Sequence, residues 1–174
     1  GPAFRDSHAA LAFAVAGDDQ SLGSMMDGLR AAAGNGDKLA VEVMLPLVQG
    51  ISAFVHEDYG EAVRLMEPLF GQDARYDQLC RVGGSHAQRE VFEDTLMEAY
   101  LRAGQFDKAE GLLNNRLKRR ESPRDMFWLA RAQEAEGDRG AAESSIRQAR
   151  DGWRDADSSS QETAALTGLA ERVS

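Results

Sequence analysis

The 174-residue sequence predicts an all-α solenoid of about four helical hairpins, followed by a C-terminal closing helix. Four short turns each lie between two stretches of helical periodicity. Apolar residues on both sides of each turn recur at positions i, i+3 or i+4, and i+7, which places them on one face of a helix. β-branched residues are sparse and rarely alternate with polar ones, so no sheet is expected. Repeated helix–turn–helix units of this kind are typical of solenoids.

The four turns share a chemistry that explains why each helix ends there. A glycine supplies the left-handed backbone conformation that ends a helix at low cost, and the polar residue that follows can cap the next helix. The turns are Ala16-Gly17-Asp18-Asp19, His56-Glu57-Asp58-Tyr59, Ala103-Gly104-Gln105-Phe106 and Glu136-Gly137-Asp138-Arg139.

The hairpins are predicted over residues of about 4–31, 38–70, 85–120 and 124–153, with the closing helix over about 161–172. Together they form one predicted domain, residues 3–174. Gly1 and Pro2 are expected to be the scar of a cleaved tag, and the natural chain is then expected to extend upstream.

Three segments are predicted to interrupt the repeats. Gly34–Asp37 and Asp155–Ser160 are expected to be loops. Gly71–Gly84 is expected to be an insertion with a short helix around Tyr76–Arg81. In the second hairpin, the stripe predicted to face the core before the turn is Val41, Met44, Leu45 and Val48.

Composition narrows the classes of partner. The net charge of −9 and the pI near 4.8 disfavour nucleic acid and anionic membranes and favour a basic partner segment. No apolar stretch approaches the roughly 18 residues that span a bilayer. Cys80 is the single cysteine, which excludes an intramolecular disulfide and fits a reducing, cytoplasmic location. Arginine predominance over lysine, with many alanines, suggests a GC-rich bacterial genome.

The third and fourth hairpins are similar to the tetratricopeptide pattern. Ala109 and Ala142 are 33 positions apart, close to the period of about 34 residues. Pro123 stands where that pattern places a helix-stopping proline. The large and small residues of the pattern fall at Tyr100, Gly104, Phe106, Ala109 and Leu113.

A longer stretch resembles one particular family. The run from Val82 to Phe92, which contains Gly-Gly-Ser-His-Ala-Gln-Arg, resembles the tetratricopeptide repeat protein 38 family. Tyr59–Val63 and Leu96–Ala109 support the likeness, which is good from Pro46 to Ala130. The resemblance implies the C-terminal part of a helical repeat scaffold, and it supplies no catalytic residues.

Within that run, Ser85 and Gln88 are predicted to form a capping box at a helix start. The capping box accounts for neither His86 nor Arg89, which are therefore candidates for contact with a ligand or partner. First helices of a right-handed stack line its concave face, so these residues are assigned to one groove. The groove candidates are His8, His86, Arg89, Glu93, Tyr100 and Arg102.

The sequence therefore favours a non-catalytic scaffold that binds a protein or peptide in a concave groove. The alternative is a small-molecule-binding or enzyme-accessory module, which a closed pocket formed by His86, Arg89 and Tyr100 would favour. A homodimer is a further possibility, since the first hairpin of a truncated array would expose apolar surface.

Other chemistries have weaker signals. No metal or cofactor is expected, because the three histidines match no zinc spacing. Nothing in the sequence fixes a base beside Cys80, and no catalytic residue is assigned. Trp128 and Trp153 are expected to pack in the core. The one basic cluster is interpreted as solvated cations at a helix C-terminus, with anion binding as the alternative; it comprises Arg116, Lys118, Arg119, Arg120 and Arg124.

Overall fold

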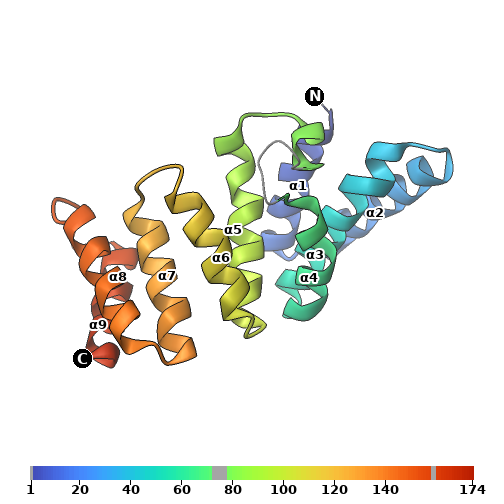
Figure 1. The fold of residues 1–174 in the computed structure, drawn as a ribbon. Helices are drawn as coiled ribbons and strands as arrows, with labels where there is room; N and C mark the ends of the chain where they lie inside the picture. The colour runs from blue at the N-terminus through green and yellow to red at the C-terminus, as the bar shows by residue number, and fades with distance from the viewer. Residues whose placement is uncertain (1, 72–77, 158–159) are drawn as a thin grey trace. The chain divides into compact units, whose positions relative to one another are not determined.

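The computed structural model of this chain describes residues 2–71, 78–157 and 160–174, and within them it is built from helices and short connections (Figure 1). This confirms the all-α prediction for the described residues. None of their helices is long and apolar enough to cross a membrane.

The helices group into two compact units, Gly1–Ala103 and Gly104–Ser174. The first unit holds the α-helices α1 (Pro2–Ala16), α2 (Asp19–Gly34), α3 (Leu45–Val55), α4 (Tyr59–Met66) and α5 (His86–Arg102). The second holds α6 (Phe106–Leu117), α7 (Pro123–Glu136), α8 (Arg139–Gly152) and α9 (Gln161–Val173). The assignment of residues 3–174 to a single domain stays a prediction.

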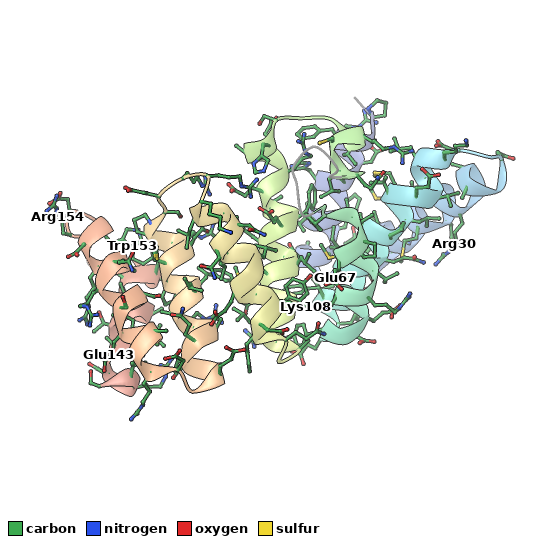
Figure 2. All side chains as sticks on the ribbon, viewed as in Figure 1. Arg30, Glu67, Lys108, Glu143, Trp153 and Arg154 are labelled. Atoms are coloured by element: carbon green, nitrogen blue, oxygen red, sulfur yellow. The ribbon has the colours of Figure 1, made fainter. Side chains whose placement is uncertain are left out.

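Within each unit, the helices pack on their neighbours along the chain. In the first unit, α1 packs against α2 and α3, α3 packs against α4 and α5, and α4 packs against α5. In the second unit, α7 packs against α6, α8 and α9, and α8 packs against α9. The closing helix predicted near 161–172 therefore covers the pair α7 and α8. Exposed charged side chains such as Arg30 and Glu143 extend from the helices (Figure 2).

The four predicted turns share one backbone conformation. The second residue of each has positive φ: Gly17 at 68°, Glu57 at 65°, Gly104 at 70° and Gly137 at 87°. In three of the turns, an aspartate then caps the next helix by accepting a hydrogen bond from the N–H three residues later. These caps are Asp18, Asp58 and Asp138.

A π-helix, Ala40–Met44, precedes α3 and was not predicted from the sequence. Pro46 has no N–H to donate, and the wider π-turn accommodates the gap that it leaves. The extra residue rotates the preceding positions about the helix axis. Val41 is therefore 50% exposed, and its predicted place in the core stripe is wrong. Val43 is buried instead, next to Met44, whose predicted burial is confirmed.

The core of the first unit is apolar and closely packed. Leu47, Ile51, Met66 and Phe92 are buried side chains contributed by α3, α4 and α5. A Cβ atom added at Gly50 would collide with the Met66 side chain, so this glycine permits the close approach of α3 and α4.

The second unit has its own core cluster, in which Phe127, Ile146 and Leu169 are buried. Trp128 and Trp153 are partly buried and pack against that cluster, which agrees with their predicted packing role. Two buried polar contacts accompany it. Ser145 donates a hydrogen bond of 2.8 Å to Gln133 Oε1, and Arg116 lies 3.1 Å from Asp125.

The predicted insertion is described only in part. Its 3₁₀-helix covers Gln78–Val82 and buries Leu79 and Val82, whereas residues 72–77, including Tyr76, lie outside the described residues. A second short 3₁₀-helix, Glu67–Leu69, follows α4. The predicted loops lie outside the helices at Asn35–Asp37 and at 155–157, while residues 158–159 lie outside the described part. Pro2 begins α1, and Gly1 is not described.

Candidate functional site

The six predicted groove residues all belong to the first unit, with His8 on α1 and the others on α5. His86, Arg89, Glu93 and Tyr100 are spaced by three, four and seven residues, so they form one stripe along α5. The stripe changes from exposed to buried along the helix. His86 is exposed, Arg89 and Glu93 are half-buried, and Tyr100 is buried.

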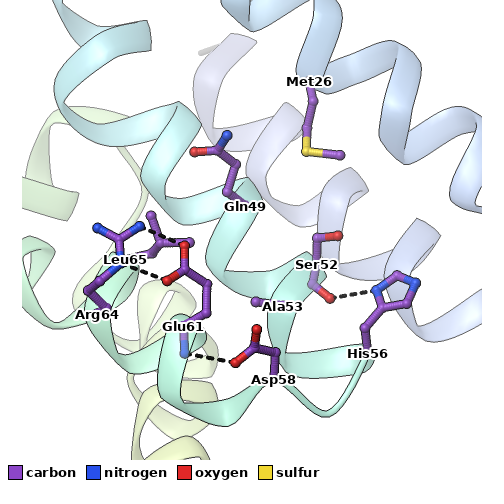
Figure 3. Close-up of a pocket in the computed structure, with 9 residues that line it drawn as sticks. All are labelled: Met26, Gln49, Ser52, Ala53, His56, Asp58, Glu61, Arg64 and Leu65. Carbon is purple, nitrogen blue, oxygen red and sulfur yellow. Dashed lines mark hydrogen bonds and ion pairs between the residues drawn. The ribbon is translucent and has the colours of Figure 1, made fainter.

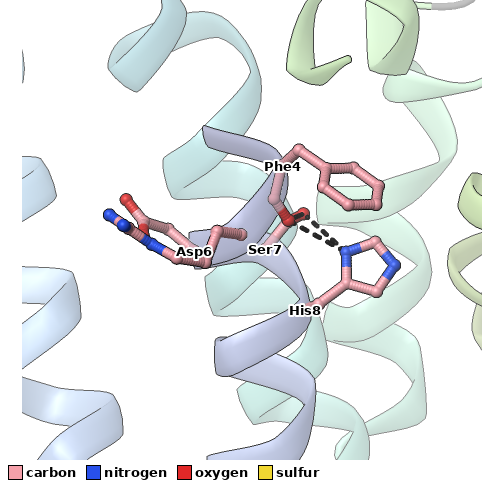
Figure 4. A network of polar contacts seen from close by, with 5 residues as sticks. Phe4, Asp6, Ser7 and His8 are labelled. Atoms are coloured by element: carbon pink, nitrogen blue, oxygen red, sulfur yellow. Dashed lines mark hydrogen bonds and ion pairs between the residues drawn. The ribbon is translucent and has the colours of Figure 1, made fainter. Parts of the chain in front are cut away.

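His8 joins α1 to the first turn of α5. Its Nδ1 donates to the Phe4 carbonyl at 2.9 Å, and its Nε2 lies 3.1 Å from the Gln88 carbonyl. The ring also packs edge-on against Phe92 and lies over Phe4. Figure 4 shows the imidazole beside Phe4 and Ser7 on α1. His8 is therefore a packing and positioning residue at the edge of the predicted groove.

Arg89 holds the loop that precedes α5. Its Nη1 donates to the carbonyl oxygens of Gly83 and Gly84, and its Nη2 lies 3.6 Å from Cys80 Sγ. Both glycines have positive φ, at 97° and 76°, so this turn depends on them. The Arg89 guanidinium thus holds a turn that requires glycine, which is a structural role that the sequence analysis did not predict.

The capping box at the start of α5 is confirmed. The Gln88 N–H donates to Ser85 Oγ at 3.3 Å, and the Ser85 N–H donates to Gln88 Oε1 at 2.8 Å. This reciprocal pair satisfies two N–H groups that a helix start otherwise leaves open. The cap leaves the exposed His86 imidazole at the first position of the helix.

Tyr100 and Arg102 lie at the far end of α5. The Tyr100 hydroxyl donates to Glu67 Oε1 at 2.9 Å, and Arg102 Nε donates to Glu98 Oε1 at 2.8 Å. The Glu98 contact also raises the pKa of Arg102. Eleven residues separate Arg89 from Tyr100, or about 16 Å along the helix axis. His86, Arg89 and Tyr100 therefore do not converge on one small-molecule pocket.

A pocket of about 420 Å³ lies elsewhere in the first unit, between α2, α3 and α4 (Figure 3). The sequence analysis assigned no binding role to any residue that lines it. The sequence signal for this pocket would have been Gln49 and Ser52, two polar residues three positions apart in the otherwise apolar helix α3. The lining side chains are Met26, Gln49, Ser52, Ala53, His56, Asp58, Glu61, Arg64 and Leu65.

One member of the basic cluster, Arg116, differs from both predicted interpretations, whereas Lys118, Arg119, Arg120 and Arg124 are exposed, as the interpretation of solvated cations expects. Arg116 is only 2% exposed, so it is neither a solvated cation nor available to an external anion. Arg120 approaches the same carboxylate of Asp125 at 3.8 Å. Nearby, Arg124 and Arg131 lie 5.7 Å and 5.0 Å from the ring centre of Trp128, within the range of cation–π attraction.

Within the part of the chain that the structure describes, no three His, Cys, Asp or Glu side chains are grouped so as to hold a metal ion. Cys80 is exposed on the 3₁₀-helix Gln78–Val82. Arg89 Nη2 lies 3.6 Å from its Sγ atom.

The sequence matches no model of a known protein family. No solved structure matches the chain. The resemblance to the tetratricopeptide repeat protein 38 family accordingly stays a prediction that rests on the run from Val82 to Phe92.

Proposed function

We propose that this chain is a non-catalytic binding module, a tetratricopeptide-like array that holds a protein or peptide segment. The packing order of the helices supports the proposal. In the first unit α1 contacts α3, and α3 contacts α5, which is the order expected if these are the first helices of hairpins that stack along the chain. Such stacking gives a continuous surface of first helices, on which an extended or helical peptide can lie.

The proposed contact surface is the accessible first half of the α5 stripe together with the adjoining start of α1. It comprises His8, His86, Arg89 and Glu93. Tyr100 and Arg102 are less suitable contacts, because Tyr100 is buried against Glu67 and Arg102 is paired with Glu98. The net charge of −9 favours a partner segment rich in lysine or arginine.

Two other roles are weaker. A small-molecule-binding or enzyme-accessory role would need a different cavity, because the predicted pocket residues do not converge. Self-association would place a second copy on the apolar surface of the first hairpin, where Val15 is 79% exposed. Light scattering at high protein concentration tests self-association, because a protein that stays strictly monomeric would exclude the dimer.

The proposal is tested by selecting binders from a random peptide library displayed on phage and titrating the enriched peptides. We expect enriched peptides to be basic. The His86→Ala, Glu93→Gln double variant should weaken binding by about tenfold, which corresponds to about 1.4 kcal/mol. Arg89 is left unchanged in this variant, because its loss would disturb the turn at Gly83 and Gly84.

The matched control is the Arg147→Ala, Glu143→Gln double variant, which likewise replaces one basic side chain and one carboxylate, both on α8. Its affinity for the selected peptides should stay within about twofold of the original. Equal losses in the two double variants, or a library without enriched peptides, would refute the proposed surface.

A further inference from the structure

The pocket between α2, α3 and α4 has unused hydrogen-bonding capacity. The side chains of Gln49 and Ser52 make no hydrogen bond to any described residue, although both line the pocket and are half-buried. A half-buried polar side chain without a protein partner bonds to water, which a ligand group can replace. Figure 3 shows both side chains on α3, around the same opening as Asp58.

The charges around this pocket leave one carboxylate without a cation. Arg64 donates two hydrogen bonds of 2.6 Å to Glu61, which hold the pKa of Glu61 below its usual value. His56 donates from Nδ1 to the Ser52 carbonyl at 2.8 Å, and its Nε2 lies 3.5 Å from Asp19. Arg64 and His56 therefore each already have an acidic neighbour. Asp58 uses one oxygen to cap α4 and has no basic partner among the described residues.

The apolar part of the pocket lining suits a linear aliphatic chain. Met26 from α2 and Leu65 from α4 contribute flexible aliphatic side chains, and Ala53 contributes a methyl group. A chain of several methylene groups can lie along such surface while its charged end reaches a polar group. The volume of about 420 Å³ falls within the range of pockets that accept small ligands.

We propose that this pocket binds a primary alkylammonium group, with its methylene stem against Met26 and Leu65. Its three N–H donors match the acceptors offered by Asp58, Gln49 and Ser52. A lysine side chain of a partner peptide and a free aliphatic diamine share this chemistry. The site does not include the α5 surface, so its failure would leave the proposed function standing.

The test is a titration of the full ¹⁵N-labelled chain, followed by NMR, with 1,5-diaminopentane and with a blocked Gly-Lys-Gly peptide. Saturable shifts should appear at Gln49, Ser52 and Asp58. 1-Pentanol has the same five-carbon stem without the charge and should cause no saturable shift there. Tighter binding of the peptide than of the diamine would identify a partner lysine as the source, and the reverse order would identify a free amine.

Asp58→Asn is the informative variant, because asparagine retains the helix cap while it removes the charge. The dissociation constant should rise about fivefold, the amount expected for one solvent-accessible ion pair. Asp138→Asn is the matched control, since Asp138 caps α8 in the same way in the other unit. The absence of saturable shifts, equal shifts with 1-pentanol, or equal effects of the two variants would overturn the assignment.

Discussion

Arg116 and Asp125 are the most deeply buried ion pair among the described residues, with side chains 2% and 3% exposed. The pair links the last turn of α6 to the first turn of α7. Removing one partner of a buried pair leaves the other charge without compensation, which costs more than the pair itself contributes.

Arg116→Met should therefore lower the free energy of unfolding by about 3 kcal/mol. Arg120→Met is the control, because Arg120 approaches the same carboxylate at 3.8 Å but is 51% exposed. It should cost less than about 1 kcal/mol. Urea denaturation measures both values, and equal losses would show that burial of Arg116 does not matter.

Glu110 is the residue whose pKa gives a pH prediction. Burial raises its pKa above 4.5, and the nearby carboxylates of Glu136 and Asp138 raise it further. The folded state therefore holds this proton more tightly than the unfolded state does. The resulting stability is complete below pH 4.5 and is lost as the pH rises through the folded pKa.

Glu110→Gln should accordingly raise the melting temperature at pH 7, by about 1–2 °C because the group is partly exposed to solvent. The gain should shrink toward zero below pH 4.5. Calorimetry at both pH values tests this, with Glu121→Gln in an exposed loop as the control. A gain that persists at low pH would contradict the electrostatic explanation.

The sequence predicted the structural roles of only some of these residues. The capping box of Ser85 and Gln88 was predictable, because it is a local pattern of four residues. The burial of Arg116 was not, because it depends on Asp125, nine positions away and on another helix. The role of Arg89 was missed for a similar reason: its partners are backbone carbonyl groups, which have no sequence signature.

At the scale of elements, the four turns show how sequence chemistry sets helix ends. Gly17, Gly104 and Gly137 adopt positive φ without steric cost, whereas Glu57 occupies the equivalent position with a side chain. A left-handed backbone costs a residue with a Cβ atom roughly 1–2 kcal/mol.

Glu57→Gly should therefore stabilise the protein by about 0.5–1 kcal/mol, after allowance for the greater freedom of glycine in the unfolded chain. Glu136→Gly is the control, since this residue precedes the positive-φ position of the fourth turn and is helical. It should destabilise by a similar amount. Thermal unfolding compares the two variants, and destabilisation by both would contradict the conformational explanation for Glu57.

The helix boundaries were largely predictable because caps, glycines and apolar periodicity coincide at each turn. The π-helix before Pro46 was not, because the periodicity of Val41, Met44, Leu45 and Val48 fits an ordinary α-helix equally well. Its extra residue is a response to the proline, and the exposure of Val41 follows from it.

At the scale of the whole molecule, the two compact units each bury a core of their own. The functional proposal depends on the first unit, where α1 contacts α3 and α3 contacts α5. The sequence correctly placed the candidate residues within helices, His8 on α1 and the others on α5. It did not separate the accessible half of the α5 stripe from the buried half, because that difference depends on the Glu67 segment packing against Tyr100.

The most direct measurement is amide hydrogen exchange of the full chain with and without a peptide selected for binding. The proposal predicts slower exchange in α1 and in the first half of α5, residues 86–93. Exchange in α6 to α9 should stay unchanged. Protection confined to α6–α9, or no protection at a saturating peptide concentration, would contradict the proposal that the first helices of the first unit form the binding surface.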